Sequence, residues 1–157
     1  MNYTTDIFSK FDKQWALLTA GKEGDFNTMT VSWGGMGTLW EKPVMTVYVR
    51  TSRYTHDFMD REDYFTVSFF PDGCRDKLAV LGSKSGRDTD KIHNSGLTAV
   101  KCKNGVTFKE AEVTFVCKKL FRQRLDPANM PKDVADTFYS KDAEHDMYIG
   151  EVVEIIS

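Results

Sequence analysis

Six consecutive residues, at positions 50–55, carry side chains that suit the binding of an anion. The run is Arg50, Thr51, Ser52, Arg53, Tyr54 and Thr55. It joins an apolar run at 44–49 to a predicted helix at 53–60, so backbone N–H groups at the helix start add to the guanidinium and hydroxyl donors. The alternative is that these residues form only a polar turn and a helix whose N-cap is Ser52.

The segment 27–33 alternates between hydroxyl-bearing and apolar side chains. A period of two places alternate residues on opposite faces of a β-strand. After Asn27, one face therefore holds Thr28, Thr30 and Ser32, and the other holds Met29, Val31 and Trp33. The β-branched and aromatic run at 44–49 predicts a second, buried strand. We expect Gly34, Gly35 and Gly37 to form the connection between the two strands.

A second polar cluster precedes another predicted helix, at 88–94. It consists of Ser83, Lys84, Ser85, Gly86 and Arg87. Two hydroxyls and two cations before a helix start suit an anion. Two alternatives are an exposed loop whose glycines only make the turn, and an ion-pair group formed by Asp88, Asp90 and Lys91 that holds the loop in place.

The sequence lacks several motifs that would point to other chemistry. It contains no GxGxxG, no Walker loop and no HExxH. His56, His93 and His145 lie far apart in sequence, so we predict no metal site. Cys74, Cys102 and Cys117 form an odd set without a CxxC pair, which indicates packing residues in a reducing, cytoplasmic compartment.

Composition favours one folded domain over residues 1–157. Hydrophobic residues make up 41% of the 157 residues, which argues against disorder. The net charge of −2 gives no general attraction to nucleic acid or membranes. No apolar run approaches the ~18–20 residues of a membrane span, and no basic segment followed by an apolar block predicts a secretory signal.

The remaining patterns predict strands with short helices between them. Strands are expected at 15–19, 63–70, 101–103, 112–124 and 147–156, with a hairpin turn at Asn104-Gly105. Helices are expected at 74–81, ending at Gly82, at 88–94, closed by Gly96, and from Pro131 to about 139. This irregular alternation favours a mainly β fold, a closed or partly closed barrel with helical insertions, over a doubly wound parallel sheet.

Several of these stretches together resemble the flavin reductase-like, FMN-binding split-barrel family, and most of all its flavoredoxin-type members. The resemblance is carried by Asn-x-Met-Thr-x-Ser-Trp-Gly-Gly-x-Gly-x-Leu-Trp-x-Lys-Pro-Val from residue 27 and by Val-Arg-x-Ser-Arg-Tyr-Thr ending at residue 55. It continues through 65–70, 82–91 and 145–152, and so covers nearly the whole chain. Glu144, where Asp is more usual, and Thr51, where Pro often stands, depart from the pattern.

The resemblance implies a fold, a cofactor and roles for residues. It implies a six-stranded Greek-key barrel and a homodimer with FMN at the subunit interface. The cluster at 83–87 would bind or frame the FMN phosphate, and the segment 27–32 would meet the polar edge of the flavin ring. Trp33 would border the ring or pack in the core. His145 would stand at the mouth of the site and contact nicotinamide or a flavin carbonyl.

Two redox functions follow from the resemblance. One is an NAD(P)H-dependent flavin reductase, and the other is a flavoredoxin-like electron carrier that exchanges electrons with a protein partner. A third reading is a flavin-binding protein without redox turnover. The sequence contains no separate motif for NAD(P)H, but the split-barrel reductases it resembles also lack one, so this absence does not separate the two functions.

Overall fold

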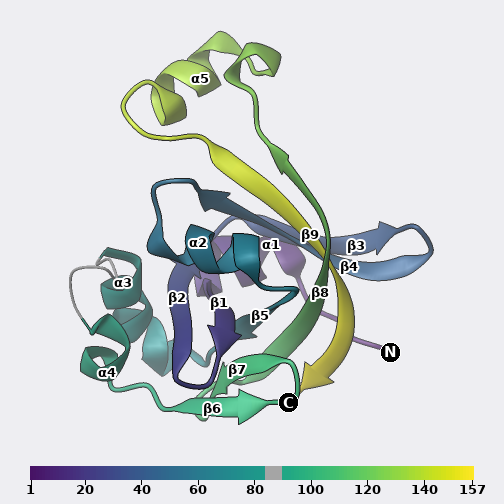
Figure 1. Ribbon diagram of the computed structural model, residues 1–157, viewed down its shortest axis with the longest axis vertical. Coiled ribbons are helices and arrows are strands. Elements are labelled where there is room, and N and C mark those ends of the chain that lie inside the picture. The colour runs from purple at the N-terminus through teal and green to yellow at the C-terminus, as the bar shows by residue number, and fades with distance from the viewer. Residues whose placement is uncertain (84–89) are drawn as a thin grey trace.

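The computed structural model describes residues 1–83 and 90–157, which form a mainly β structure with short helices (Figure 1). The strands are β1 (Ala16–Lys22), β2 (Asp25–Val31), β3 (Gly34–Leu39), β4 (Lys42–Arg50), β5 (Tyr64–Phe69), β6 (Ala99–Cys102), β7 (Gly105–Phe108), β8 (Val113–Arg124) and β9 (His145–Ile156). The helices are α1 (Ile7–Ser9), α2 (Tyr54–Arg61), α3 (Arg75–Ser83), α4 (Lys91–Ser95) and α5 (Lys132–Tyr139). Shorter helical turns are η1 (Lys10–Gln14), η2 (Asp72–Cys74) and η3 (Pro127–Asn129).

The main sheet is antiparallel and has the strand order β2-β1-β5-β8-β9-β4-β3. It contains seven strands and is not closed, with β2 and β3 at its edges, whereas the sequence suggested a six-stranded barrel. Strands β6 and β7 form a separate hairpin. Irregular register between β8 and β9, at Val116/Cys117 and Lys119/Phe121, accompanies the curvature of these long strands (Figure 1).

The glycine-rich segment is a strand, and the prediction that it is only a connection was wrong. Residues 34–39 pair with β4, and the hairpin closes at Trp40 and Glu41. Both have positive φ, 52° and 60°, as a tight hairpin turn requires. The sequence did not reveal this turn because such positions usually hold Gly, Asn or Asp. Gly34 is required within the strand, since a Cβ there would lie 2.7 Å from the Phe11 ring.

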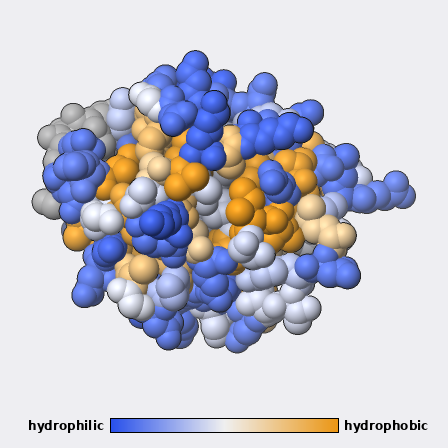
Figure 2. All heavy atoms as spheres, turned by 90° about the horizontal axis from the view of Figure 1, so that it is seen from below, coloured by the Kyte–Doolittle hydropathy of each residue, from blue (hydrophilic) through white to orange (hydrophobic). Residues whose placement is uncertain are grey.

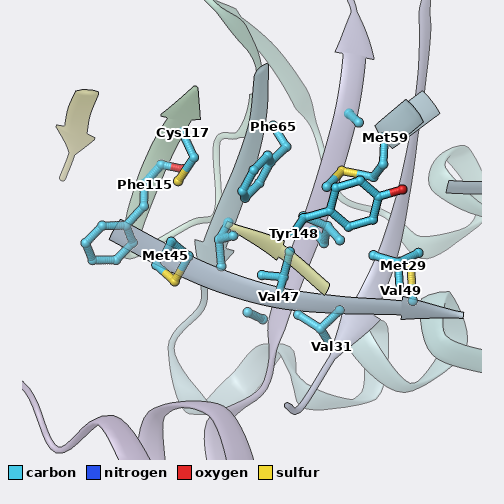
Figure 3. Packing of buried hydrophobic residues seen from close by; sticks show 14 of the residues in the cluster. Met29, Val31, Met45, Val47, Val49, Met59, Phe65, Phe115, Cys117 and Tyr148 are labelled. Carbon is cyan, nitrogen blue, oxygen red and sulfur yellow. The ribbon is translucent and has the colours of Figure 1, made fainter. Parts of the chain in front are cut away.

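The core lies on the inner face of the sheet (Figure 3). Met45, Val47 and Val49 alternate along β4 and meet Phe65 and Tyr148 from neighbouring strands in one buried cluster (Figure 3). Each such side chain contributes about 1.5–3 kcal/mol when fully buried. This cluster fixes the register of β4 and β9, because a one-residue slip would turn these residues outward.

A smaller cluster lies under α3 and α4. It contains Leu17, Phe70, Leu78 and Leu81, all buried. Because Leu78 and Leu81 anchor α3 against β1 and β2, the C-terminal end of α3 is held close to the exposed edge of β2. Helix α3 continues through Gly82 to Ser83, slightly beyond the predicted end.

The other helices match the sequence with small differences. Helix α2 begins after Arg53, whose side chain makes no capping bond, so Ser52 is not the N-cap. The side chain of Asp90 caps α4, and Gly96 ends it in the left-handed conformation with φ 77°, as predicted. The β6–β7 hairpin forms at the predicted place, with Gly105 at φ 147°.

Helix α5 lies at the far end of β8 and β9, which extend beyond the rest of the sheet (Figure 1). The register of this extension pairs Arg124 with Asp146. No helix in the described part of the chain is long and apolar enough to cross a membrane. Seen from below, polar residues cover most of the surface and apolar residues gather in patches between them (Figure 2).

Candidate functional site

A small pocket lies where β2 ends, between β4, β9 and the start of α2. Its volume is about 180 Å³. Several segments far apart in sequence meet here because β9 pairs with β4, and the turn after β4 leads into α2. The pocket is lined by Met29, Thr30, Val31, Ser32, Trp33, Tyr48, Arg50, Arg53 and His145. Seven of these nine residues were site candidates from the sequence; Val31 and Tyr48 were not.

Arg53 brings a desolvated positive charge to this pocket. Its Nη1 donates to the carbonyl oxygen of Gly82 at 3.4 Å. Its Nη2 is buried and has no hydrogen-bond partner among the described residues. Burial lowers the pKa of Arg53. An unsatisfied buried donor on a charged group is costly, so this atom suits an anionic ligand.

Lys91 is a buried cation beside the half-buried Arg53. Burial, together with the nearby charge of Arg53, lowers the pKa of Lys91 to about 8. Its Nζ donates to the carbonyl oxygen of Leu81 at 3.1 Å. Arg53 and Lys91 therefore bind neighbouring carbonyls at the C-terminal end of α3, where cations are favoured by the helix dipole. Together they make the entrance to α2 electropositive.

His145 stands at the start of β9 and is buried. Its Nδ1 lies 2.7 Å from the hydroxyl of Tyr139. The Trp33 ring lies 5.3 Å from the imidazole, and Phe138 packs edge-on against Trp33 at 5.5 Å. Burial, and then the charge of Arg50, lower the pKa of His145 to about 4. The imidazole is therefore neutral at neutral pH and has an aromatic setting.

A family comparison decides what kind of protein has this arrangement. A model of the family described as "Flavin reductase like domain" matches residues 8–156. The chain belongs to the flavin reductase-like family. No curated protein matches it significantly.

Solved structures of FMN-binding and flavin reductase proteins share the split-barrel fold of this flavin reductase-like chain. A flavoredoxin from Methanosarcina acetivorans has a TM-score of 0.71 at 21% identity, covering 100% of this chain and 74% of its own. An FMN-binding protein from Thermus thermophilus has a TM-score of 0.73 at 22% identity, with 100% and 77% covered. The styrene monooxygenase flavin reductase from Pseudomonas putida has a TM-score of 0.67 at 19% identity, with 92% and 79% covered.

Arg50 of this flavin reductase-like chain lines the pocket but is already held by protein groups. Its Nη1 donates to the carbonyls of Ala143 at 2.6 Å and Phe138 at 3.1 Å. Its Nε lies 3.4 Å from an Asp142 carboxylate oxygen, and its guanidinium lies over the Tyr139 ring. Arg50 therefore joins β4 to α5 and to the segment before β9. The hydroxyl of Ser52 lies in the same group, 3.5 Å from Asp142.

Three polar candidates have their side chains in the interior. The Asn27 amide donates to the hydroxyl of Thr55 at 2.8 Å. The Thr28 hydroxyl donates to the Leu18 carbonyl at 3.1 Å and lies 2.9 Å from the Thr19 hydroxyl. These contacts tie β2 to β1 and α2, so the Thr28 and Thr55 side chains support the site from behind. Sequence periodicity placed Thr28 on the hydroxyl face but could not show that this part of the face is covered.

The remaining candidates lie around the pocket. Thr30 donates its hydroxyl to the Leu78 carbonyl, and with Ser32 and Ser83 it lines a shallow groove beside α3. Tyr54 lines a separate groove between β2, α2 and α4, which Asn27 also lines. Lys84, Ser85, Gly86 and Arg87 lie outside the described residues.

The structure also reveals residues that the sequence did not mark. Tyr48 lines the pocket from β4, and Tyr139 contacts His145 from α5. Lys91, which the sequence suggested only as part of a structural ion-pair group with Asp88 and Asp90, is buried and neighbours Arg53; Asp88 lies outside the described residues. No local pattern identifies a lone tyrosine or lysine of this kind, because its significance depends on contacts between distant elements.

An ionic network around the buried side chains of His56 and Asp146 lies behind the site. The His56 Nε2 lies 2.6 Å from Asp146, and Arg124 donates to the same carboxylate at 2.9 Å. Tyr148 and Arg122 donate to Asp60, at 2.6 Å and 2.8 Å. His56, Asp60 and Asp146 lie close enough for a shared ion, but arginine already binds both carboxylates. The network connects α2 to β9. Helix α2 begins directly after Arg53, and β9 begins with His145, so the network links the elements that position these two pocket residues.

Proposed function

We propose that this protein binds FMN and uses it to transfer electrons from NAD(P)H, or from a redox protein partner. The observation that carries the proposal is the buried Nη2 of Arg53, which has no partner among the described residues. It lies on a residue that lines the pocket at the end of β2. A flavin phosphate would supply the missing acceptor, and family membership makes a flavin the expected ligand.

The protein residues have distinct roles in this proposal. FMN would supply the redox chemistry, and the protein would bind and orient it. Arg53, with Lys91 beside it, would hold the phosphate. Strand β2 is an edge strand, so one row of its backbone donors and acceptors is available to the polar edge of the flavin ring. Ser32 and Trp33 would frame that ring.

His145 has a binding and positioning role in the proposal. Because its low pKa leaves it neutral, it would act as a hydrogen-bond donor or acceptor near the flavin instead of as a charged group. It would orient the nicotinamide of the donor or a flavin carbonyl. A hydride passing to the flavin needs no general base, which agrees with a neutral imidazole in the site.

The choice between FMN and FAD has a direct test. The described residues contain no helix-and-strand unit for an adenylate, so we expect FMN to be the flavin released on denaturation. Recovery of FAD alone, or failure of the apoprotein to take up FMN, would contradict the proposal.

Turnover has a separate test that distinguishes a reductase from a carrier. The yellow holoprotein is mixed anaerobically with NADH or NADPH, and loss of visible flavin absorbance is followed. Rapid bleaching supports the reductase. If neither nucleotide bleaches a flavin that dithionite does reduce, the protein is a carrier of the flavoredoxin type or a binding protein without turnover.

The proposal includes a homodimer with the site at its interface, and a single domain that works in the cytoplasm. Apolar side chains beside the pocket favour the dimer: Trp33 is 45% exposed and Phe138 38%. The three cysteines are all free, which suits a reducing compartment. A monomer by light scattering at micromolar concentration, with flavin still bound, would refute the dimer.

A further inference from the structure

A second, larger groove adjoins the pocket described above. Its volume is about 790 Å³, within the usual range of small-molecule sites of roughly 300–1,000 Å³. One wall comes from the N-terminal helical segment through Phe8 and Phe11, and the other comes from the start of β3 through Gly35 and Met36. The groove is thus formed by an edge strand and the helical turns packed beside it.

The groove and the pocket share three wall residues. Ser32, Trp33 and Tyr48 line both. Trp33 lies between the groove and His145, whose ring is 5.3 Å from the indole. A molecule in the groove would therefore lie directly beside a flavin in the pocket. This closeness gives the groove a role in electron transfer, on the basis of the proposed flavin function.

The chemistry of the walls restricts the ligand. Phe8, Phe11, Trp33, Met36 and Tyr48 present aromatic and thioether surfaces, which favour flat aromatic ligands. Among the described residues, the charged ones in the lining are Asp12 and Lys13, which pair with each other at 3.1 Å and are both largely exposed. In the described part of the lining, no unpaired charge would attract a nucleotide phosphate.

Gly35 lines the groove beside open space. A Cβ at Gly35 would meet no atom within 4 Å, so the space beside this residue is open. Gly34 differs, because a Cβ there would strike the Phe11 ring and the Thr46 carbonyl. Gly35 has no positive φ, so its backbone does not require glycine. A side chain at position 35 would occupy part of this open space.

We propose that this groove binds an uncharged, planar aromatic electron acceptor of the quinone class. Reduction of a quinone to a hydroquinone takes two electrons and two protons. A two-electron-reduced flavin carrying two protons supplies all of them and returns to its oxidised form. The reduced flavin itself is regenerated by NAD(P)H or, in a test, by dithionite.

The test compares two glycine substitutions in the same strand. Gly35→Val adds a side chain at the groove wall, whereas Gly37→Val is the matched control, because position 37 also has open space but does not line the groove. Valine is favourable in a strand. Menadione, an uncharged naphthoquinone, is the probe. Its binding to the oxidised protein is measured by calorimetry, and its reduction is measured with dithionite-reduced holoprotein.

We expect Gly35→Val to weaken menadione binding by about tenfold or more. The menadione concentration that gives half-maximal oxidation of the reduced flavin should rise by the same factor. Its affinity for FMN and its oxidation by ferricyanide, a charged acceptor, should match the wild type. Gly37→Val should behave like the wild type throughout. If Gly35→Val does not fold, Phe8→Ala replaces it, since Phe8 is 85% exposed and its loss should weaken menadione binding without harming stability.

Two results would overturn the proposal. One is unchanged menadione binding in Gly35→Val and Phe8→Ala. The other is a change in molecular mass in Gly35→Val by light scattering, which would show that a second copy of the chain fills the groove. A protein that binds no FMN at all would instead refute the proposed function, and calorimetry with menadione would still report on the groove.

Discussion

The hydroxyl of Tyr139 lies 2.7 Å from Nδ1 of His145, and it links α5 to the first residue of β9. Burial raises the pKa of Tyr139, so its hydroxyl remains protonated at neutral pH. Burial also keeps the imidazole neutral. We infer that the phenol donates to Nδ1 and that the proton of the imidazole is on Nε2. A fixed tautomer gives His145 one defined hydrogen-bonding role toward the pocket.

Replacing Tyr139 by Phe should remove this control and leave the ring packing intact. We expect flavin reduction to slow by about five- to tenfold, the value of one hydrogen bond of ~1–1.5 kcal/mol, with little change in FMN affinity. Nitrogen NMR of His145 should show a mixture of tautomers. Tyr64→Phe, on β5, is the control. A single unchanged tautomer in Tyr139→Phe would contradict the inference.

Removing the imidazole tests whether His145 acts in turnover or only in the scaffold. His145→Ala should keep most of its FMN but reduce it more slowly with NAD(P)H, or with the protein partner of a carrier. Reduction rate and melting temperature are measured on the same preparation. An unchanged rate with a lowered melting temperature would make His145 a structural residue only.

The pH dependence of stability should carry the signature of a buried neutral histidine. The pKa of His145 falls from 6.5 to about 4 on folding, so the unfolded chain binds more protons between these values. Stability should therefore be full above pH 6.5 and fall as the pH drops towards 4. At about 1.4 kcal/mol per pKa unit, reduced for partial solvent access, the loss is of the order of 2 kcal/mol.

Urea unfolding at pH 7 and pH 4.5 measures this term. The difference in unfolding free energy between the wild type and His145→Asn isolates it from other titrating groups. That difference should shrink at the lower pH. A difference that stays constant between the two pH values would show that His145 is not buried in its neutral form.

The ionic network behind the site should matter for stability. Asp146 is fully buried and accepts bonds from His56 and Arg124. Asp146→Ala should destabilise the protein by about 2–4 kcal/mol, because it removes a fully buried carboxylate and leaves the buried His56 without its partner. The matched control is Asp136→Ala, which removes an exposed pair with Lys132 and should cost less than about 0.5 kcal/mol. Equal losses would contradict the network's role.

Local pattern predicted the strands and most helix ends, because alternation and turn residues act over a few positions. Gly96 and Asn104-Gly105 are examples. It failed at residues 34–39, where pairing with β4 made a strand of a glycine-rich segment.

Within the site, local pattern identified Arg53 and His145 as candidates but not what surrounds them. Tyr139 and Lys91 reach these residues only after α5 and α4 have packed in place. Thr28 is the opposite case. Its hydroxyl lies on the predicted face of β2, but it donates to the Leu18 carbonyl of β1 and does not face the pocket. Which side chains are buried, and which groups they hydrogen-bond, depends on tertiary contacts that sequence periodicity cannot predict.

The affinities of FMN and riboflavin for Arg53→Ala test the central claim most directly. The matched control is Arg61→Ala, because Arg61 lies at the exposed end of α2, where it pairs with Asp25. Losing one charge-assisted contact should cost roughly 1.5–3 kcal/mol, or about 10- to 150-fold in FMN affinity. We predict that Arg53→Ala loses this much affinity for FMN and much less for riboflavin, which has no phosphate. Arg61→Ala should lose no affinity for either ligand. Equal losses for FMN and riboflavin in Arg53→Ala would contradict a phosphate site at Arg53.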